Sequence, residues 1–257
     1  MELTADEARE AIDKGIPLLQ AGRVGVDPHA VEDELRRLSR NLAETAELGT
    51  AAQRTAEKLG AETVDLAPLL GPALSAERAT IERAAGDLGV DADALAELLE
   101  LALQPFLWEA TARLGALTDI DRWDRGYCPV CGAWPGLAEL LGPEKRRALR
   151  CVRCGVMWSW FVLLCPYCGN DDHRTLGVLQ EEGSPSRVDV CRSCNGYVKA
   201  IPSYTPSAAV MLAAADVTTM HLDLAAGEAG YKRPGDVDVR TAGIPRLVRQ
   251  RASYAQE

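Results

Sequence analysis

Apolar residues recur at the three- and four-residue spacing of amphipathic helices from about residue 27 to residue 117. The first stripe follows Asp27-Pro28, where an N-cap carboxylate precedes a proline at a position that needs no hydrogen-bond donor. Residues 1–26 show no such stripe and are expected to be weakly organised, and the prolines and glycine of residues 68–72 predict a loop. The predicted helices cover residues 27–46, 51–59, 75–88, 91–104 and 106–117, with a cap at Ser75 and a break or kink at Pro105. Their apolar faces predict a small helical bundle.

The pattern changes at residues 119–126, after which alanine and leucine give way to cysteine, tryptophan, glycine and short β-prone runs. Two of these runs, residues 158–164 and 187–190, predict strands. Helical spacing returns at Val210 and continues to about Gly230, so one further helix is expected there. The chain is therefore predicted to be α+β, with a mainly helical N-terminal bundle, a cysteine-rich middle and a C-terminal helix.

All eight cysteines lie in the middle part, as four pairs with two residues between the members of each pair. Linkers of 19, 10 and 22 residues separate successive pairs. Two tight turns of this kind aim four thiolates at one point, which is the ligand set of a closed tetrahedral metal site. The candidate metal ligands are Cys128, Cys131, Cys151, Cys154, Cys165, Cys168, Cys191 and Cys194. Four pairs supply two complete sites, so two tetrathiolate-bound metal ions per chain are expected.

Sequential grouping of the pairs gives two modules with the linker lengths of zinc-ribbon or rubredoxin-like folds. An interleaved grouping, first with third and second with fourth, is also compatible with the spacing. The expected domains are a helical domain over residues 1–120, a first rubredoxin-like module over 121–160, a second over 161–205, and a C-terminal helix and tail over 206–257.

The residue after each cysteine pair is suited to a tight turn around a metal. Glycine occupies this place at Gly132, Gly155 and Gly169, and asparagine occupies it at Asn195. Both residue types tolerate a positive φ. Turns of this kind point backbone N–H groups at the sulfurs, which stabilises the thiolates. Iron and zinc both accept four thiolates in a tetrahedron, so these residues by themselves do not select the metal.

Charge and composition narrow the possible functions. Residues 1–120 carry a formal charge of −12 and residues 121–200 carry +2, within a net charge of −10. Nucleic acid is therefore not an expected partner, because phosphate binding needs a concentrated basic surface. The chain has no run of about 18 apolar residues, and its acidic start lacks the layout of a signal peptide. We expect no membrane span and a cytoplasmic location, where cysteines bind metals more often than they form disulfides.

The sequence shows no catalytic group of residues beside the cysteines. A catalytic zinc keeps one coordination position open and has a general base nearby, whereas four thiolates close a site. The three histidines, His29, His173 and His221, are scattered along the chain. His173 follows the third cysteine turn and is a candidate hydrogen-bond donor to a ligating sulfur, while the other two are interpreted as structural. The protein is therefore not expected to be an enzyme.

With these motifs identified, the chain resembles the formate dehydrogenase accessory protein family called FdhE. The resemblance covers about residues 103–234, and the N-terminal 100 residues match only in being helical. It rests on Tyr127–Pro135, Arg147–Gly155 with Trp158 after it, Cys165–Cys168, Val190–Lys199 and Asp216–Arg233.

The resemblance implies a cytoplasmic maturation factor with a helical N-terminal part and two rubredoxin-like modules. It implies binding to the molybdenum- or tungsten-containing catalytic subunit of formate dehydrogenase, with the eight cysteines as metal ligands. Family precedent favours iron as the metal, although zinc can occupy the same sites. The alternative is a rubredoxin-like electron-transfer protein. A third hypothesis, a zinc-ribbon nucleic-acid binder, is disfavoured by the acidic N-terminal part.

Overall fold

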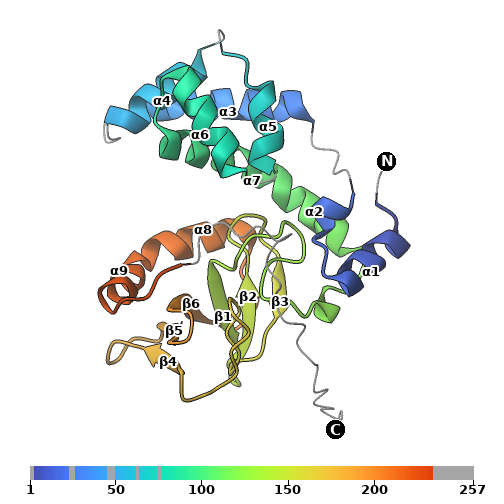
Figure 1. The fold of residues 1–257 in the computed structure, drawn as a ribbon, viewed down its shortest axis with the longest axis vertical. Coiled ribbons are helices and arrows are strands. Elements are labelled where there is room, and N and C mark those ends of the chain that lie inside the picture. The colour runs from blue at the N-terminus through green and yellow to red at the C-terminus, as the bar shows by residue number, and fades with distance from the viewer. Residues whose placement is uncertain (1–2, 23–26, 45–49, 62–63, 75–76, 234–257) are drawn as a thin grey trace. The chain divides into compact units, whose positions relative to one another are not determined.

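The computed structural model describes residues 3–22, 27–44, 50–61, 64–74 and 77–233. Contacts divide the chain into two units, one of residues 24–110 and one of residues 1–23 with 111–257 (Figure 1). In this division residues 1–23 go with the cysteine-rich part of the chain rather than with the other N-terminal helices. The domain boundaries expected from the sequence stay predictions.

The unit of residues 24–110 is helical, as predicted. Its helices are α3 (Pro28–Ala43), α4 (Thr50–Gly60), α5 (Ala67–Leu74), α6 (Arg78–Leu88) and α7 (Ala92–Gly115), the last of which continues into the other unit. The start of α3 is confirmed, because the Asp27 side chain accepts a hydrogen bond from the His29 backbone N–H at 3.0 Å. Ser75, the predicted cap of the helix ending at Leu88, lies outside the described residues.

The prolines of this unit interrupt its helices less than expected. The loop predicted at residues 68–72 is wrong, because these residues are part of α5, and α7 runs through Pro105 without a break, so of the predicted break or kink only the kink stays a prediction. Leu103 and Leu107, on either side of Pro105, are fully buried, and α5 buries Leu69 and Leu70. Tertiary burial of an apolar face supplies most of the stability of a helix in a protein. Here that burial outweighs the hydrogen bond that each proline removes.

The second unit begins with helices that the sequence analysis did not expect. α1 (Ala5–Lys14) and α2 (Leu18–Ala21) lie within the segment predicted to be weakly organised. A capping box starts α1, because the Glu7 N–H donates to the Thr4 hydroxyl at 3.3 Å and the Thr4 N–H donates to the Glu7 carboxylate at 2.9 Å. Ile12, on the inner face of α1, is buried. The prediction for residues 1–26 is therefore wrong for this part.

A six-stranded sheet forms the core of this unit (Figure 1). Its strands are β1 (Leu137–Leu141), β2 (Arg146–Arg150), β3 (Met157–Ser159), β4 (Leu176–Leu179), β5 (Arg187–Cys191) and β6 (Gly196–Ser203). They lie in the order β3-β2-β1-β6-β5-β4. Neighbouring strands are antiparallel, except that β1 and β6 are parallel. The two cysteine modules therefore share one sheet.

The two halves of the sheet repeat each other. Each module contributes a hairpin and then a third strand, so that its strands lie in the order third, second, first along the sheet. The halves meet where Leu137 of β1 lies opposite Lys199 of β6. Because both halves run in the same sense, the repeat is head-to-tail rather than two-fold symmetric.

The strand predicted at residues 187–190 is confirmed as β5, whereas the one predicted at residues 158–164 is shorter than expected. β3 ends at Ser159, and residues 162–164 form a turn. Side chains hold this turn: Trp160 Nε1 donates to the Leu164 carbonyl at 3.0 Å, and Arg147 Nη1 donates to the same carbonyl at 3.4 Å. The backbone is thus bound by side chains instead of a neighbouring strand.

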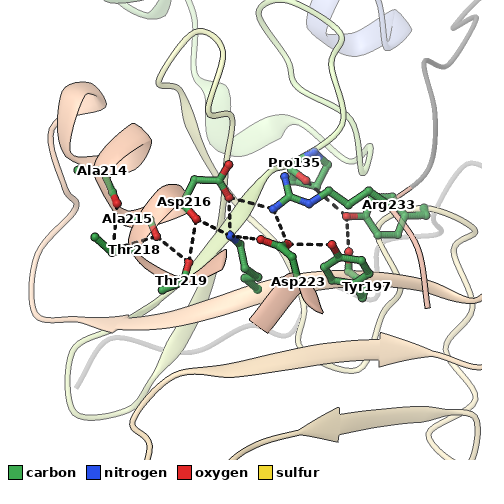
Figure 2. Close-up of polar contacts among 11 residues, drawn as sticks. Pro135, Tyr197, Ala214, Ala215, Asp216, Thr218, Thr219, Asp223 and Arg233 are labelled. Atoms are coloured by element: carbon green, nitrogen blue, oxygen red, sulfur yellow. Dashed lines mark hydrogen bonds and ion pairs between the residues drawn. The ribbon is translucent and has the colours of Figure 1, made fainter. Parts of the chain in front are cut away.

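The single C-terminal helix predicted from Val210 to Gly230 is two helices, α8 (Ala209–Thr218) and α9 (Met220–Glu228), with a bend of 50° between them. Figure 2 shows the Thr218 and Thr219 hydroxyls at the bend, where they donate to the carbonyls of Ala214 and Ala215 at 2.9 and 2.6 Å. Such back-bonding bends helices. Among the described residues no helix alone has both the length and the apolar character of a membrane span, although α8 and α9 taken together do.

Candidate metal centres

The first group of cysteines contains Cys128, Cys131, Cys151 and Cys154, whose sulfur atoms all lie within 4.8 Å of one another. Across the two turns, the Cys128 and Cys154 sulfurs are 3.4 Å apart, and the Cys131 and Cys151 sulfurs are 3.5 Å apart. A tetrahedral site with metal–sulfur bonds of about 2.3 Å places its sulfurs about 3.8 Å apart. The first group therefore has nearly the dimensions of a tetrathiolate metal site.

The second group contains Cys165, Cys168, Cys191 and Cys194, and it meets the same test. The Cys165 and Cys194 sulfurs are 3.7 Å apart, and the Cys168 and Cys191 sulfurs are 3.8 Å apart. The structure thus brings the pairs together in sequence order, with β1–β2 between the turns of the first group and β4–β5 between those of the second. None of the eight cysteines forms a disulfide.

The four cysteine turns have the backbone conformation that their sequences predict. The glycine or asparagine that follows each pair has a positive φ: 82° at Gly132, 77° at Gly155, 70° at Gly169 and 55° at Asn195. In each of the three glycine turns, the glycine N–H donates to the carbonyl of the first cysteine at 2.8–3.1 Å. Residue types that accept a left-handed backbone are therefore needed at these four positions.

Hydrogen bonds to sulfur come partly from residues that the sequence analysis did not name. The backbone N–H groups of Val130 and Cys131 donate to the Cys128 sulfur at 3.4 and 3.3 Å, as expected for such a turn. In the second group, Asn170 Nδ2 lies 3.8 Å from the Cys191 sulfur. The predicted donor His173 is exposed, and within the described part of the chain no bond from it to a sulfur is found. The sequence signal for this donor is the side-chain amide of Asn170, which follows the glycine of the third turn.

Burial opposes the ionisation of these thiols. It raises the pKa of the Cys128 thiol and of the Cys165 thiol, and it raises the pKa of Cys194 to about 11. Hydrogen bonds from Cys128, together with those of the other two cysteines in the group, lower the pKa of Cys131. Four thiolates can occupy one such group only when a cation compensates their charge, so metal binding releases protons.

The N-terminal helices support the first centre. The backbone N–H groups of Leu18 and Leu19 each donate to a carbonyl of the first turn, those of Pro129 and Val130, at 2.9 Å. Tyr127, next to the first ligand, donates its hydroxyl to the Gly15 carbonyl at 2.7 Å. These bonds join residues more than a hundred positions apart, so the sequence pattern gave no sign of them.

A buried ionic network supports the second centre and attaches the C-terminal helices to the sheet (Figure 2). Lys199 of β6 is fully buried, and its Nζ donates to the Asp223 carboxylate at 2.7 Å and to the Asp216 carbonyl at 2.8 Å. Arg233 bonds both carboxylates at 2.9 and 2.8 Å, and the Tyr197 hydroxyl donates to Asp223 at 2.8 Å. The network joins β6, α8, α9 and the segment after α9.

The network also shifts the ionisation of one of its members. Burial alone raises the pKa of Asp223, but hydrogen bonds from Lys199 and Tyr197 and the charge of Arg233 outweigh it. The pKa of Asp223 therefore lies below its ordinary value of 3.8. The segment after α9 is also bound to the fourth cysteine turn. The N–H of Lys232, the residue before Arg233, donates to the Asn195 carbonyl at 2.9 Å.

Two groups of four cysteines, each on a turn–hairpin–turn–strand module, define a protein with two rubredoxin-like centres on a shared sheet. In the comparison with known proteins, residues 163–238 match the family model described as "FdhE, C-terminal domain". The "Protein FdhE homolog" of Aquifex aeolicus is 30% identical over 147 residues, covering 56% of this chain and 51% of that protein. The one of Stutzerimonas stutzeri is 32% identical over 146 residues, covering 54% and 47%.

A solved structure shares the fold. The crystal structure of the FdhE protein from Pseudomonas aeruginosa matches with a TM-score of 0.59 and 23% identity, over 92% of this chain and 79% of that one. The chain is similar to FdhE proteins over part of its length, and the resemblance to that family and the α+β fold class are confirmed. The chain spans about half the length of the curated relatives it matches.

Proposed function

We propose that this protein is a cytoplasmic accessory factor for the maturation of formate dehydrogenase. In this proposal it binds the catalytic subunit through the two-module domain and carries out no reaction of its own. Similarity to FdhE proteins supports the connection with formate dehydrogenase.

The single observation that carries the proposal is that the eight cysteines form two groups of four, which use every cysteine of the chain. A metal ion with four thiolate ligands has no open position for a substrate. We propose that each group holds one ion, iron by family resemblance or zinc, and that the ions stabilise the surface offered to a partner. Modules of this size are too small to build an adequate core without a metal.

Two measurements test the proposal. Metal analysis and a visible spectrum of protein purified without oxygen should give two metal ions per chain, with ferric thiolate absorption if the metal is iron. Immobilised protein should also capture the formate dehydrogenase catalytic subunit from the native host. A chain with two metals that captures no such subunit would count against the accessory function.

One observation favours the alternative, a rubredoxin-like electron-transfer protein. Four aromatic rings form a chain of edge-to-face contacts from the first centre to the second, with centroid distances of 5.3 Å (Trp123–Tyr127), 6.2 Å (Tyr127–Trp134) and 5.3 Å (Trp134–Tyr167). Aromatic rings also cover and stabilise small modules by packing alone, without any electron transfer. The ring contacts therefore do not outweigh the accessory function. Reversible reduction and reoxidation of bound iron would support the alternative, and failure to cycle would remove it.

A further inference from the structure

A cavity of about 110 Å³ lies in the second module, directly beside the second cysteine group. Cys165 and Cys191 form part of its wall, together with strands β4 and β5 and the turn at residues 162–164. The wall is mainly apolar. None of the contacts described above for the two cysteine groups or for the Lys199 network uses the space it encloses.

Strand β4, which lines this cavity, is an edge of the sheet. Within the described part of the chain it pairs only with β5, so its other side presents backbone N–H and C=O groups without a strand partner. Proteins usually protect such edges with lysine, proline or a bulge. Residues 176–179 read Leu-Gly-Val-Leu, and the Val178 side chain is 49% exposed. This edge is therefore open to a further strand.

Apolar side chains continue from the edge strand onto the turn beside the cavity. Phe161, Val162 and Leu163 are 68, 40 and 48% exposed, and the last two also line the cavity. Consecutive exposed apolar side chains next to a cavity are typical of a binding surface. Together with Val178 they form a surface that we call the β4 surface.

The size of the cavity limits what can enter it. Binding pockets for drug-sized molecules usually measure about 300–1,000 Å³. A cavity of about 150 Å³ holds a single benzene molecule. The cavity beside β4 is therefore large enough for one aliphatic side chain, but it is too small for a nucleotide or a comparable cofactor.

The charged groups of the cavity wall are paired with one another. Arg147 and Asp189 both line the cavity, and the two side chains are paired at 3.4 Å between Nε and Oδ2. Both atoms are buried within the wall. Arg187 is also paired with Asp189, at 2.8 Å, so the wall holds no isolated carboxylate to attract a cationic ligand.

We propose that the β4 surface binds an extended apolar segment of a partner protein, which adds a strand to the edge of β4 and inserts one aliphatic side chain into the cavity. Main-chain hydrogen bonds would supply affinity and the cavity would supply selectivity, as in other cases of strand addition. The inference rests on the proposed function in taking the partner to be the catalytic subunit of formate dehydrogenase.

A second apolar surface competes with this one. Five side chains of α8 and α9 are exposed: Val210, Met211, Val217, Met220 and Leu224. This surface has no free strand edge, because helical backbone groups bond within the helix, and it has no share in the cavity wall. It therefore serves as the matched control in the test.

The test uses the full metal-loaded chain and fluorescein-labelled ten-residue peptides that tile the host's formate dehydrogenase catalytic subunit. At least one apolar peptide should bind by fluorescence anisotropy, and it should slow hydrogen exchange at residues 176–179 at least tenfold. Val178→Lys and Leu163→Lys should each weaken this binding at least tenfold, because they place a charge on the β4 surface. Val217→Lys, on α8, should leave the affinity within twofold. Each variant is first shown to hold two metal ions.

Three outcomes overturn the inference. These are the absence of any peptide that binds, binding that Val178→Lys and Leu163→Lys leave unchanged, and loss of binding or protection at α8 rather than at β4. Capture of the full-length catalytic subunit separates this inference from the proposed function. If the Val178→Lys variant captures the subunit as well as the native chain does, the β4 surface is refuted and the accessory function stands. If the native chain captures nothing, both are refuted.

Discussion

Replacement of Lys199 by methionine tests the role of the buried ionic network most directly. Methionine is close to lysine in volume and apolar, so it removes the ammonium group and leaves the packing of the side-chain stem largely intact. The two carboxylates lose their fully buried partner and keep Arg233, and Asp223 also keeps the Tyr197 hydroxyl. Removing one member of a buried ion pair costs about 3–5 kcal/mol.

The expected loss lies at the lower end of that range, about 3 kcal/mol, because the Asp216 and Asp223 side chains are 29 and 24% exposed and remain paired. A loss of this size corresponds to a change of roughly 150-fold in the equilibrium that detaches the C-terminal helices. Hydrogen exchange at buried positions of α9, such as Leu222, should therefore speed up by about two orders of magnitude.

Lys14→Met is the matched control, because Lys14 pairs with Glu10 on the exposed face of α1. Exposed pairs of this kind contribute about 0–1 kcal/mol, so the control should exchange at close to the native rate. A free-energy change below 1 kcal/mol for Lys199→Met would refute the reasoning. Hydrogen exchange that is unchanged in α9 but faster in another part of the chain would refute it as well.

Three further predictions concern the centres and their supports. Replacing Cys128 and Cys131 together by serine should lower the metal content from two ions to one by elemental analysis, whereas two retained ions would disprove the assignment of the first centre. Asn195→Val should destabilise the fourth turn by about 1–2 kcal/mol in denaturant unfolding, because valine resists a φ of 55°, while Asn195→Gly should cost nothing. Because the pKa of Asp223 is depressed, its contribution to stability is present above about pH 4 and is lost as the pH falls through the folded-state pKa. The difference in stability between the native chain and Asp223→Asn should therefore shrink in acid. A difference that stays constant with pH would contradict this prediction.

The features that could be predicted from the sequence are those set by local spacing. Two residues between cysteines, a glycine or asparagine after each pair and a linker of hairpin length are local signals, and the structure groups the cysteines in that order. The start of α3 at Asp27 is equally local. The capping box of Thr4 and Glu7 was an available signal of the same kind and was overlooked.

Other features depend on contacts that no local pattern reports. Lys199 meets Asp216 and Asp223 across 17 and 24 positions of the sequence, with no periodicity to indicate the pairing. The parallel pairing of β1 with β6 joins residues that are still further apart in the sequence. The continuation of α7 through Pro105 has a different cause, since the local penalty of a proline is known but the burial that overcomes it is decided by tertiary packing.

The parallel pairing of β1 with β6 sets an order of events during synthesis. The first module is complete on the ribosome once β3 has emerged, but β1 then still lacks its second neighbour. All five residues of β1 are buried in the finished sheet, so the incomplete chain displays an apolar strand that other nascent chains can join. β6 begins two residues after Cys194, a member of the second group, so a metal ion bound by that group would help to bring β6 into place. Metal shortage at the second centre would therefore appear first as aggregation of the half already made.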